Sequence, residues 1–491
     1  MNILKKIFSD FMAINPVQRQ SLLTFGSIVA VTAIGFISTF YFAHYLGPAI
    51  LGTFFLFLAY YGIFDLISDG GFSGAAVKRI SEGRLQSEYY TAYFILRLVL
   101  LCFSVAVFVL ISPYISEFNG NDLFSWFILA LVVGTFYNFT TTNLFGTAQV
   151  GVMQTTTLFN TIVKTLVQIL AVFLGFGIGG LVAGFIAGMI AAAILNMKFL
   201  QLSLSRCNRS HIESLLSFSV WTFLSSGGFL SFTYADTILI GYLMSETDVG
   251  IYRVAFQLTS VSSFMVIALH NVLYPRISRW HSEKKISLIE YSLSRSFTYS
   301  LLLAIPVTAG GAILADKLLY FLYGASFVPG ATVFIILLFM QIANIFMFLQ
   351  TSCLNAMDRP RISFYVTATS AILNIVLNIL LIPDFGIAGA GLASLVTMSV
   401  NAVLAYLALK SSLHIRIDAG SVMNMIISAI IMSAFVIGYM YVISIRDFIS
   451  LGLSIGIGAI IYFLVLLLID KTIRSELKEL LDTMNIPLIP G

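Results

Sequence analysis

The sequence predicts an all-α membrane protein with fourteen transmembrane helices, in which helices 1–6 and helices 7–12 form two related six-helix bundles. Three observations predict this fold: many long apolar stretches, basic residues concentrated on one side of the membrane, and an internal repeat. Of the 491 residues, 59% are hydrophobic and only 10% are charged, whereas soluble domains carry about 25% charged residues. This composition excludes a soluble enzyme, a disordered chain and a nucleic-acid-binding protein.

The number of spans follows from the lengths of the apolar stretches. A helix rises about 1.5 Å per residue, so about 20 apolar residues cross a hydrocarbon core about 30 Å thick. Fourteen stretches meet this requirement: 22–44, 49–78, 89–113, 122–147, 155–176, 178–200, 215–243, 249–275, 294–315, 328–354, 361–382, 386–409, 419–443 and 447–470. The strands of a membrane barrel would instead alternate over about ten residues, so the expected spans are helices.

The basic residues predict the orientation, because Lys and Arg concentrate in cytoplasmic loops. With the N-terminus in the cytoplasm, only Lys317 and Arg446 fall in outer loops, and only Arg97, Lys164 and Arg253 fall within spans. The sequence therefore predicts a multi-pass protein of the plasma membrane with both termini in the cytoplasm.

Two terminal segments are predicted to lie at the inner membrane surface. Residues 1–21 combine an apolar face at helical spacing with lysines opposite, and the tail 471–491 has a similar pattern. We expect both segments to be anchors, and the first lacks the features of a cleavable signal peptide.

An internal repeat divides the chain into halves. Three short matches recur in the same order: 21–25 with 214–218, 79–81 with 276–278, and 176–180 with 385–389. Each half holds six helices, an even number, so both keep one orientation and are related by an axis along the membrane normal. The predicted bundles are 22–200 and 215–410, joined by a cytoplasmic linker at 201–214, with helices 13 and 14 at 419–470 outside the repeat.

Charged residues inside the spans are candidate functional residues, because a charge at membrane depth normally faces a partner, a cavity or water. Asp65 and Asp69 share one face of helix 2. Arg97 comes to the depth of Asp69 on the antiparallel helix 3, and Asp236 and Arg253 take comparable places on helices 7 and 8. The sequence predicts two ion pairs, one in each half.

Two alternatives for these charges stay open. Both arginines lie near span ends, so their guanidinium groups could snorkel to the headgroups. The two helix-2 carboxylates could be ordinary counterions, caps of a helix break beside Gly70-Gly71, or residues that bind a coupling ion.

Lys164 lies in the middle of helix 5 and has no obvious local partner. It aligns with Asn160 and Gln168 in a polar stripe at i, i+4 and i+8. Snorkelling is disfavoured, because neither membrane surface is within reach of its ammonium. The functional hypothesis is a cationic cavity in which Arg97, Lys164 and Arg253 bind the phosphate of an anionic headgroup, since Arg offers a bidentate fork and Lys a point charge.

A second polar group lies in the second half. Asn374 and Asn378 share a face of helix 11, and Ser394 and Thr397 lie on helix 12. Amide, hydroxyl and carboxylate oxygens suit a small hard cation, and Asp236 could supply the charge. The alternative is that these side chains only form hydrogen bonds between neighbouring helices.

The pattern of motifs resembles the polysaccharide-biosynthesis branch of the multidrug/oligosaccharidyl-lipid/polysaccharide exporter superfamily. The resemblance rests on Tyr234–Gly241, Val249–Tyr252, Leu322–Gly324 and the stretch Asn374–Ala390, within a chain of two six-helix repeats plus two helices. It implies a flippase for polyprenyl-linked oligosaccharides, whose headgroup passes a central cavity while the lipid tail stays in the bilayer at a gate lined by helices 1 and 8.

The resemblance also implies a cation site. In the related lipid II flippases a sodium site combines residues that match Asp236, Asn374, Asn378 and Thr397 of this sequence. Asn378 stands where that pattern has a carboxylate, which argues against sodium coupling. No cofactor is expected, and a sodium or proton gradient, the membrane potential and downhill flow all stay open as the energy source.

The predicted function is therefore a flippase that moves a polyprenyl-(di)phosphate-linked oligosaccharide from the cytoplasmic to the outer leaflet by alternating access. The substrate contacts would be Arg97, Lys164, Arg253, Asn160 and Gln168. We expect a monomer among membrane lipids that works with glycosyltransferases or a polymerase of the same pathway.

Two other functions are weighed against this one. A cation-coupled multidrug exporter of the same superfamily would prefer an acidic, aromatic cavity, which three basic residues in the spans disfavour. A membrane-embedded glycosyltransferase or polymerase is disfavoured, because the outer connection 316–328 is short and no nucleophile or metal cluster is evident. Three scattered cysteines indicate neither a disulfide framework nor a metal site.

Overall fold

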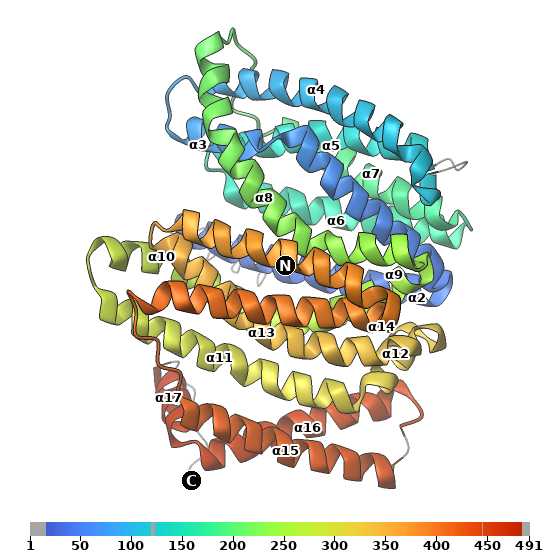
Figure 1. Cartoon of the computed structure of the whole chain (residues 1–491), viewed down its shortest axis with the longest axis vertical. Coiled ribbons are helices and arrows are strands. Elements are labelled where there is room, and N and C mark those ends of the chain that lie inside the picture. Colours follow the sequence, from blue (N-terminus) through green and yellow to red (C-terminus); the bar gives the residue numbers. More distant parts are fainter. Residues whose placement is uncertain (1–15, 119–122, 444, 484–491) are drawn as a thin grey trace, which may run out of the picture. The chain divides into compact units, whose positions relative to one another are not determined.

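The computed structural model describes residues 16–118, 123–443 and 445–483, and every regular element in these ranges is a helix (Figure 1). Eleven of these helices are long and apolar enough to cross a membrane. The chain is thus all-helical, as predicted. Residues 1–15 of the expected N-terminal anchor and residues 484–491 of the expected tail lie outside the described residues.

The α-helices follow one another along the chain, with four short 3₁₀ helices between them. Their bounds are α2 (Pro16–Asp69), α3 (Phe72–Ser81), α4 (Gln86–Ile111), η1 (Ser112–Tyr114), η2 (Ser116–Phe118), α5 (Leu123–Gly146), α6 (Val150–Phe173), α7 (Gly177–Met197), α8 (Arg209–Leu243), α9 (Glu246–Thr259), η3 (Ser260–Ser263), α10 (Phe264–Ser282), α11 (Ile286–Ile313), α12 (Ala315–Tyr323), η4 (Ala325–Gly330), α13 (Ala331–Ala356), α14 (Pro360–Lys410), α15 (Ala419–Val442), α16 (Phe448–Ile469) and α17 (Lys471–Thr483).

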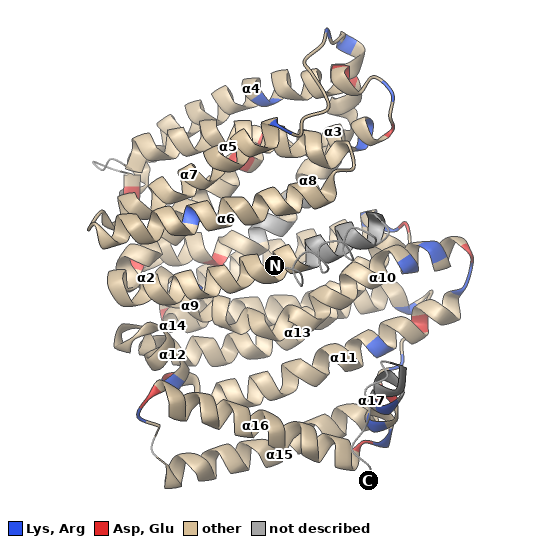
Figure 2. Ribbon diagram, turned by 180° about the vertical axis from the view of Figure 1, so that it is seen from behind, with Lys and Arg blue, Asp and Glu red and all other residues tan. Residues whose placement is uncertain are grey.

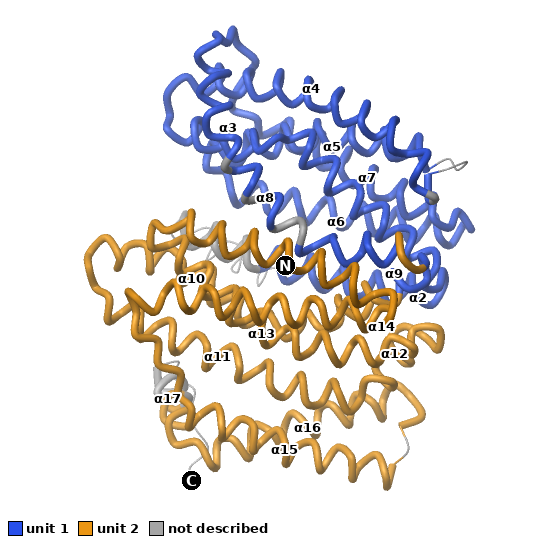
Figure 3. The backbone as a smooth tube through the Cα atoms, viewed as in Figure 1, with its two compact units in different colours: residues 1–241, 245–250 blue, residues 242–244, 251–491 orange. Residues whose placement is uncertain are grey.

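Packing divides the chain into two units (Figure 3). Unit 1 comprises the described residues of 1–241 and 245–250, and unit 2 those of 242–244 and 251–491. By this division α8 packs with the helices that precede it, whereas the repeat would place it first in the second bundle. The boundaries that the repeat predicts are a matter of sequence register and stay a prediction.

Unit 1 is held together by aromatic side chains from three helices. Phe57 and Phe64 of α2, Phe108 of α4 and Phe127 of α5 are all buried. The rings of Phe64 and Phe108 meet edge to face with centroids 5.4 Å apart, and those of Phe57 and Phe127 do so at 5.5 Å. These are the geometries that aromatic quadrupoles favour, and they fix α4 and α5 against the second part of α2.

Two glycine positions interrupt α2 and its continuation. Gly47, with φ 72°, is a non-helical residue inside α2 and is followed by Pro48. Gly70 and Gly71, with φ 56° and 76°, end α2 and start α3 in the left-handed region that favours glycine. A Cβ at Gly71 would lie 2.5 Å from the backbone nitrogen of Phe223 on α8. The break therefore allows α8 to approach the backbone closely.

Unit 2 has two hydrophobic clusters, one on either side of α11. One cluster joins α10, α11, α13 and α14 around the fully buried Phe297. The other attaches α15 and α16 to α11, where Tyr462 Oη of α16 donates a hydrogen bond to the Leu302 carbonyl at 3.2 Å. α14 contains the non-helical Gly386, with φ 58°.

A short 3₁₀ helix, η3, separates α9 from α10 in unit 2. Gln341 of α13 is buried against this break: its side-chain oxygen accepts from Ser263 Oγ at 2.8 Å, and its nitrogen donates to Thr259 Oγ1 at 3.3 Å. The side chain of a neighbouring helix thus binds hydroxyl groups at the point where the helix changes its pitch.

Asp470 joins α15, α16 and α17 at the end of the last span. Burial would raise the pKa of its carboxyl group, but hydrogen bonds from the Ile473 backbone N–H at 2.9 Å and the Asn424 amide at 3.1 Å hold that pKa below its usual range. Because the folded-state pKa is lowered, the charged carboxylate stabilises the fold above the unfolded pKa of about 4, and this contribution is lost as the pH falls through the folded value.

We therefore expect the substitution Asp470→Asn to lower the melting temperature at pH 7, and this deficit to shrink as the pH is reduced from 5 towards 3. The measurement is thermal unfolding of both proteins in detergent, followed by tryptophan fluorescence at each pH. A deficit that stays constant over this range would contradict the assignment.

Candidate functional site

The ion pair predicted in the first half is present, and it joins three charged residues. Arg97 of α4 is only 1% exposed. Its Nη2 lies 2.6 Å from Asp65 Oδ1, and its Nη1 donates to Asp69 Oδ1. The two aspartates lie one helical turn apart on α2, so both can face one guanidinium group. The alternative of snorkelling is wrong for Arg97.

Neutral polar groups complete this arrangement. Asn138 Nδ2 of α5 donates to both carboxylate oxygens of Asp65, at 3.1 and 3.2 Å, and Ser73 Oγ of α3 donates to Asp69 Oδ2 at 2.8 Å. We call these five residues the Arg97 network: Asp65, Asp69, Ser73, Arg97 and Asn138. The contact of Asn138 with Asp65 and that of Ser73 with Asp69 were not predicted from the sequence. An amide in the middle of an apolar span was a usable signal for Asn138, whereas Ser73 depends on the break at Gly70-Gly71.

The Arg97 network holds two carboxylates and one guanidinium group, so with both aspartates ionised it carries one more negative than positive charge. Both terminal nitrogens of Arg97 are bound to carboxylates, and its Nε is buried without a hydrogen-bond acceptor among the described residues. A phosphate group could reach this guanidinium only if the network opened. The predicted contact of Arg97 with substrate stays a prediction that requires such a change.

The polar stripe on α6 faces the neighbouring helix α7. Gln168 is 2% exposed, and its Nε2 donates to the Leu181 carbonyl of α7 at 2.7 Å. A Cβ at Gly188 of α7 would lie 2.5 Å from Asn160 Oδ1 and 2.9 Å from Lys164 Cβ. The glycines of α7 therefore let the two backbones approach, as small residues do in membrane bundles.

Lys164 lies in the centre of this contact. Its side chain is half-buried, and no carboxylate within the described ranges forms an ion pair with it. This agrees with the absence of a local partner in the sequence. Its backbone carbonyl and Cβ lie in the contact with α7, and its role as a ligand of the substrate stays a prediction.

The second predicted ion pair divides between the units. Asp236 is buried on α8 in unit 1, whereas Arg253 lies on α9 in unit 2, with its guanidinium 5.4 Å from the ring centroid of Phe256. The pairing of these two residues stays a prediction.

Three members of the predicted sodium site belong to α14 in unit 2 and are buried: Asn374, Asn378 and Thr397. Asn374 Nδ2 lies 3.5 Å from Ser394 Oγ, and Asn378 Nδ2 donates to the Asn374 carbonyl at 2.9 Å. Asn374 Oδ1 is buried and has no hydrogen-bond donor among the described residues. An uncommitted amide oxygen is a suitable ligand for a hard cation, although Asp236, the fourth member, belongs to unit 1.

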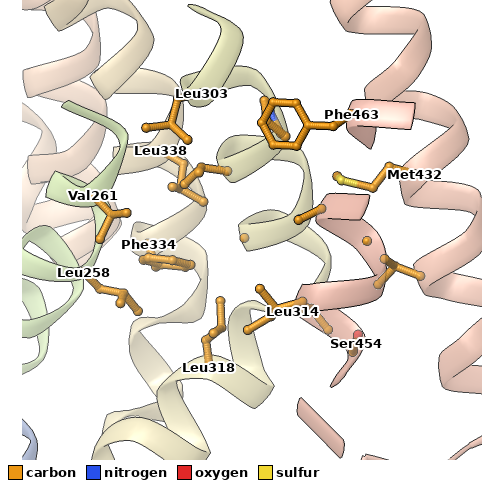
Figure 4. A pocket seen from close by; sticks show the side chains of 18 residues that line it. Leu258, Val261, Leu303, Leu314, Leu318, Phe334, Leu338, Met432, Ser454 and Phe463 are labelled. Atoms are coloured by element: carbon orange, nitrogen blue, oxygen red, sulfur yellow. The ribbon is translucent and has the colours of Figure 1, made fainter. Parts of the chain in front are cut away.

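Unit 2 also contains an apolar pocket of about 280 Å³ that the sequence did not predict (Figure 4). It is lined by α9, η3, α11, α13, α15 and α16, with Leu258 and Phe334 on one wall and Met432 and Phe463 on another. Ser454 is the one lining residue with a polar side chain. The pocket can hold an apolar chain and offers almost no hydrogen-bonding group.

Charged residues in each unit gather at helix ends and connecting loops, which leaves long stretches of most helices uncharged (Figure 2). The Arg97 network and Lys164 are therefore unusual by position as well as by burial.

Comparison with known proteins gives consistent results along the chain. A family model described as polysaccharide biosynthesis protein matches residues 42–332. Two proteins of Haloferax volcanii are each 27% identical: the probable low-salt glycan biosynthesis flippase Agl15, over 95% of this chain and 99% of its own, and the probable flippase AglR, over 94% and 98%.

Solved structures with the same fold are more distant in sequence. The inward closed conformation of the lipid II flippase MurJ matches with a TM-score of 0.76 at 16% identity, over 93% of this chain and 99% of its own. The inward-facing conformation of a multidrug resistance MATE family transporter of the MOP superfamily has a TM-score of 0.66 at 14% identity, over 78% and 96%. At these identities the likeness is one of fold.

The Arg97 network makes a prediction about stability. The substitution Arg97→Ala leaves the buried carboxylate of Asp69 and the partly buried one of Asp65 without a cation, so we expect a loss of about 3 kcal/mol in the free energy of unfolding. The measurement is denaturation of the purified protein in detergent. The triple variant Arg97→Leu, Asp65→Asn, Asp69→Asn removes all three charges and should recover most of the loss. An Arg97→Ala protein as stable as wild type would refute the role of the network.

The contact between α6 and α7 makes a second prediction. In Gly184→Ala the new Cβ would lie 2.8 Å from the Lys164 carbonyl oxygen and close to Gln168 Cγ, so the helices must separate. We expect a loss of about 1–3 kcal/mol, as in other overpacked interiors. Gly179→Ala on the same helix is the matched control, because its Cβ would meet no atom within 4 Å among the described residues. Equal melting temperatures for the two variants would contradict this packing.

Proposed function

Because the chain belongs to the polysaccharide biosynthesis protein family, we propose that it is a flippase that moves a polyprenyl-(di)phosphate-linked oligosaccharide from the cytoplasmic to the outer leaflet. The observation that carries this proposal is the match along nearly the whole chain to two relatives named as probable flippases, one of them for glycan biosynthesis. The shared fold of the lipid II flippase MurJ supports a lipid-linked substrate. All these proteins are transporters, which supports transport over an enzymatic reaction.

The proposal includes fourteen spans and two six-helix repeats. α2 and α14 each contain one non-helical glycine, Gly47 and Gly386, near the expected turns after helices 1 and 11. Dividing both helices there, and counting α8 as a span, gives the architecture on which alternating access depends. Both termini then lie in the cytoplasm, as the distribution of basic residues indicates.

The substrate phosphate would be attracted by the basic residues inside the spans. Lys164 is the best supported of these, because it is half-buried at mid-span and no ion pair within the described residues neutralises it. Asn160 and Gln168 would position it through the α6–α7 contact. Arg97 would join when the Arg97 network opens, and Arg253 would contribute from unit 2.

The coupling cation, a proton or sodium, has two proposed places. The excess negative charge of the Arg97 network favours one cation at Asp65 or Asp69, since an unmatched charge at membrane depth is costly. The uncommitted amide oxygen of Asn374 favours the second place, with Asn378, Thr397 and Asp236 as further ligands. The polyprenyl tail would stay in the bilayer at the gate lined by helices 1 and 8, and the apolar pocket beside α11 has room for a short segment of an apolar chain.

The experiment that tests the function is reconstitution of the purified protein in vesicles with a labelled lipid-linked oligosaccharide. Access of the label to a membrane-impermeant reagent on each leaflet is measured with and without an ion gradient. We expect Lys164→Ala to reduce the transfer rate about 10- to 100-fold, because a hydrogen bond to a charged group contributes about 1.5–3 kcal/mol.

Two controls accompany this variant. Lys164→Arg keeps the positive charge and should retain more transport than Lys164→Ala. Lys317→Ala removes a lysine outside the spans and should leave the rate unchanged. Transport by Lys164→Ala at the wild-type rate would remove this residue from the mechanism, and the absence of transport by the wild type would overturn the function.

A further inference from the structure

A polar pocket of about 510 Å³ lies in unit 2, at the end where α11 and α15 begin. Its walls are the first turns of α11, which carry Glu290, Ser294 and Arg295, and the connection between α14 and α15, which carries His414 and Arg416. The proposed transport uses none of these groups, so they are available for a separate role.

The two carboxylates of this pocket, Glu290 and Asp418, form hydrogen bonds with the segments that line it. Glu290 Oε1 accepts the backbone N–H of His414 at 2.6 Å, and the imidazole Nδ1 of the same residue lies 3.7 Å away. Asp418 caps α15: its carboxylate accepts from the backbone N–H groups of Gly420 and Ser421, at 3.1 and 3.2 Å, and from the Ser421 hydroxyl. The partial positive charge of the helix start compensates this carboxylate.

The uncommitted groups of the pocket are hydrogen-bond donors. Arg416 is exposed, and its guanidinium forms no ion pair or hydrogen bond with any residue of the described ranges. The Ser294 hydroxyl is likewise without a partner in that part of the chain. Arg416 and Ser294 are therefore free to donate to a ligand in the pocket.

Arg295 is held in place beside them. Its guanidinium is paired with Glu476 of α17 and lies 5.6 Å from the ring centroid of Tyr291. Glu476 is the partner of Arg295, whereas Arg416 forms no ion pair with a described carboxylate, although Glu290 and Asp418 belong to the same lining. The planar guanidinium fork of Arg416 is the group that matches the oxygens of a phosphodiester.

The position of the pocket indicates where the phosphodiester comes from. α11 starts at Ile286 and α15 at Ala419, both at the first residue of a candidate span, and the amphipathic α17 follows directly after α16. Helix ends of this kind lie at the depth of lipid headgroups. Arginine side chains between spans at this depth bind anionic headgroups.

We propose that this pocket binds the phosphodiester of an anionic lipid headgroup, with Arg416 and Arg295 as its cationic ligands and the Ser294 hydroxyl as a further donor. A bound lipid would bridge α11 and the α14–α15 connection, next to the contact that holds α17. The site is distinct from the proposed substrate cavity, and it does not depend on transport.

The test is native mass spectrometry of the full chain released from nanodiscs that contain phosphatidylglycerol and phosphatidylcholine in equal amounts. We expect the wild type to retain phosphatidylglycerol preferentially, and Arg416→Ala to reduce this retention about tenfold, as for the loss of one charged hydrogen-bonded pair. Arg416→Lys should keep an intermediate retention. Arg446→Ala, which removes an exposed arginine from another connection, should equal the wild type.

A second arm distinguishes a lipid from a soluble phosphate. Inorganic phosphate at millimolar concentration should lower retention of phosphatidylglycerol in the wild type and have no effect in Arg416→Ala. Equal retention of both lipids by the wild type, or equal losses in Arg416→Ala and Arg446→Ala, would overturn the proposal. Binding of inorganic phosphate without any retention of phosphatidylglycerol would overturn the assignment to a lipid. Because no substrate is present, these results do not depend on whether the chain is a flippase.

Discussion

A guanidinium group and two carboxylates inside a bundle of apolar helices impose the strongest constraint on unit 1. Each ion alone would lose its hydration at a cost of several kcal/mol, and only close pairing with further hydrogen bonds offsets that cost. Asp65 and Asp69 must therefore stay within reach of Arg97, which fixes α2 against α4, and Asn138 adds α5 to the same contact. The helix break at Gly70-Gly71 contributes to this arrangement, because it lets Ser73 at the start of α3 reach Asp69.

The same constraint connects substrate binding with ion binding under the proposed function. A phosphate group and the two carboxylates would compete for one guanidinium group, and a cation on either carboxylate would weaken its hold on Arg97. Binding of the cation and access of the phosphate to Arg97 would thus be coupled through one set of hydrogen bonds. Such coupling is reciprocal, so a phosphate that draws Arg97 away would in turn strengthen binding of the cation.

The parts of the site that depend on helical spacing and on depth in the membrane could be predicted from the sequence. The separation of Asp65 from Asp69 and the depth of Arg97 follow from the rise per residue, and the predicted ion pair is present. The periodicity of α6 defined a polar face but not the helix that this face contacts. The glycines of α7 at positions 180, 184 and 188 were the available signal, since small residues four apart mark a close helix contact.

The apolar pocket could not be predicted for a different reason. α15 and α16 are apolar around most of their circumference, because both protein and lipid favour apolar side chains. Hydropathy then gives no indication of which face meets α11, and the contact of Tyr462 with the Leu302 carbonyl becomes visible only in the packed structure.

The polar side chains near the helix breaks differ between the two units. At the break after α2 in unit 1, the nearby polar groups are the ionised side chains of the Arg97 network, whereas at η3 in unit 2 they are the amide of Gln341 and the hydroxyls of Thr259 and Ser263. Amides and hydroxyls keep their hydrogen bonds unchanged when pH or ion concentration changes, but a carboxylate that gains a cation loses much of its attraction for a guanidinium group. If the coupling ion binds at Asp65 or Asp69, the response begins at the break in unit 1, and η3, whose polar groups are neutral, responds only through packing.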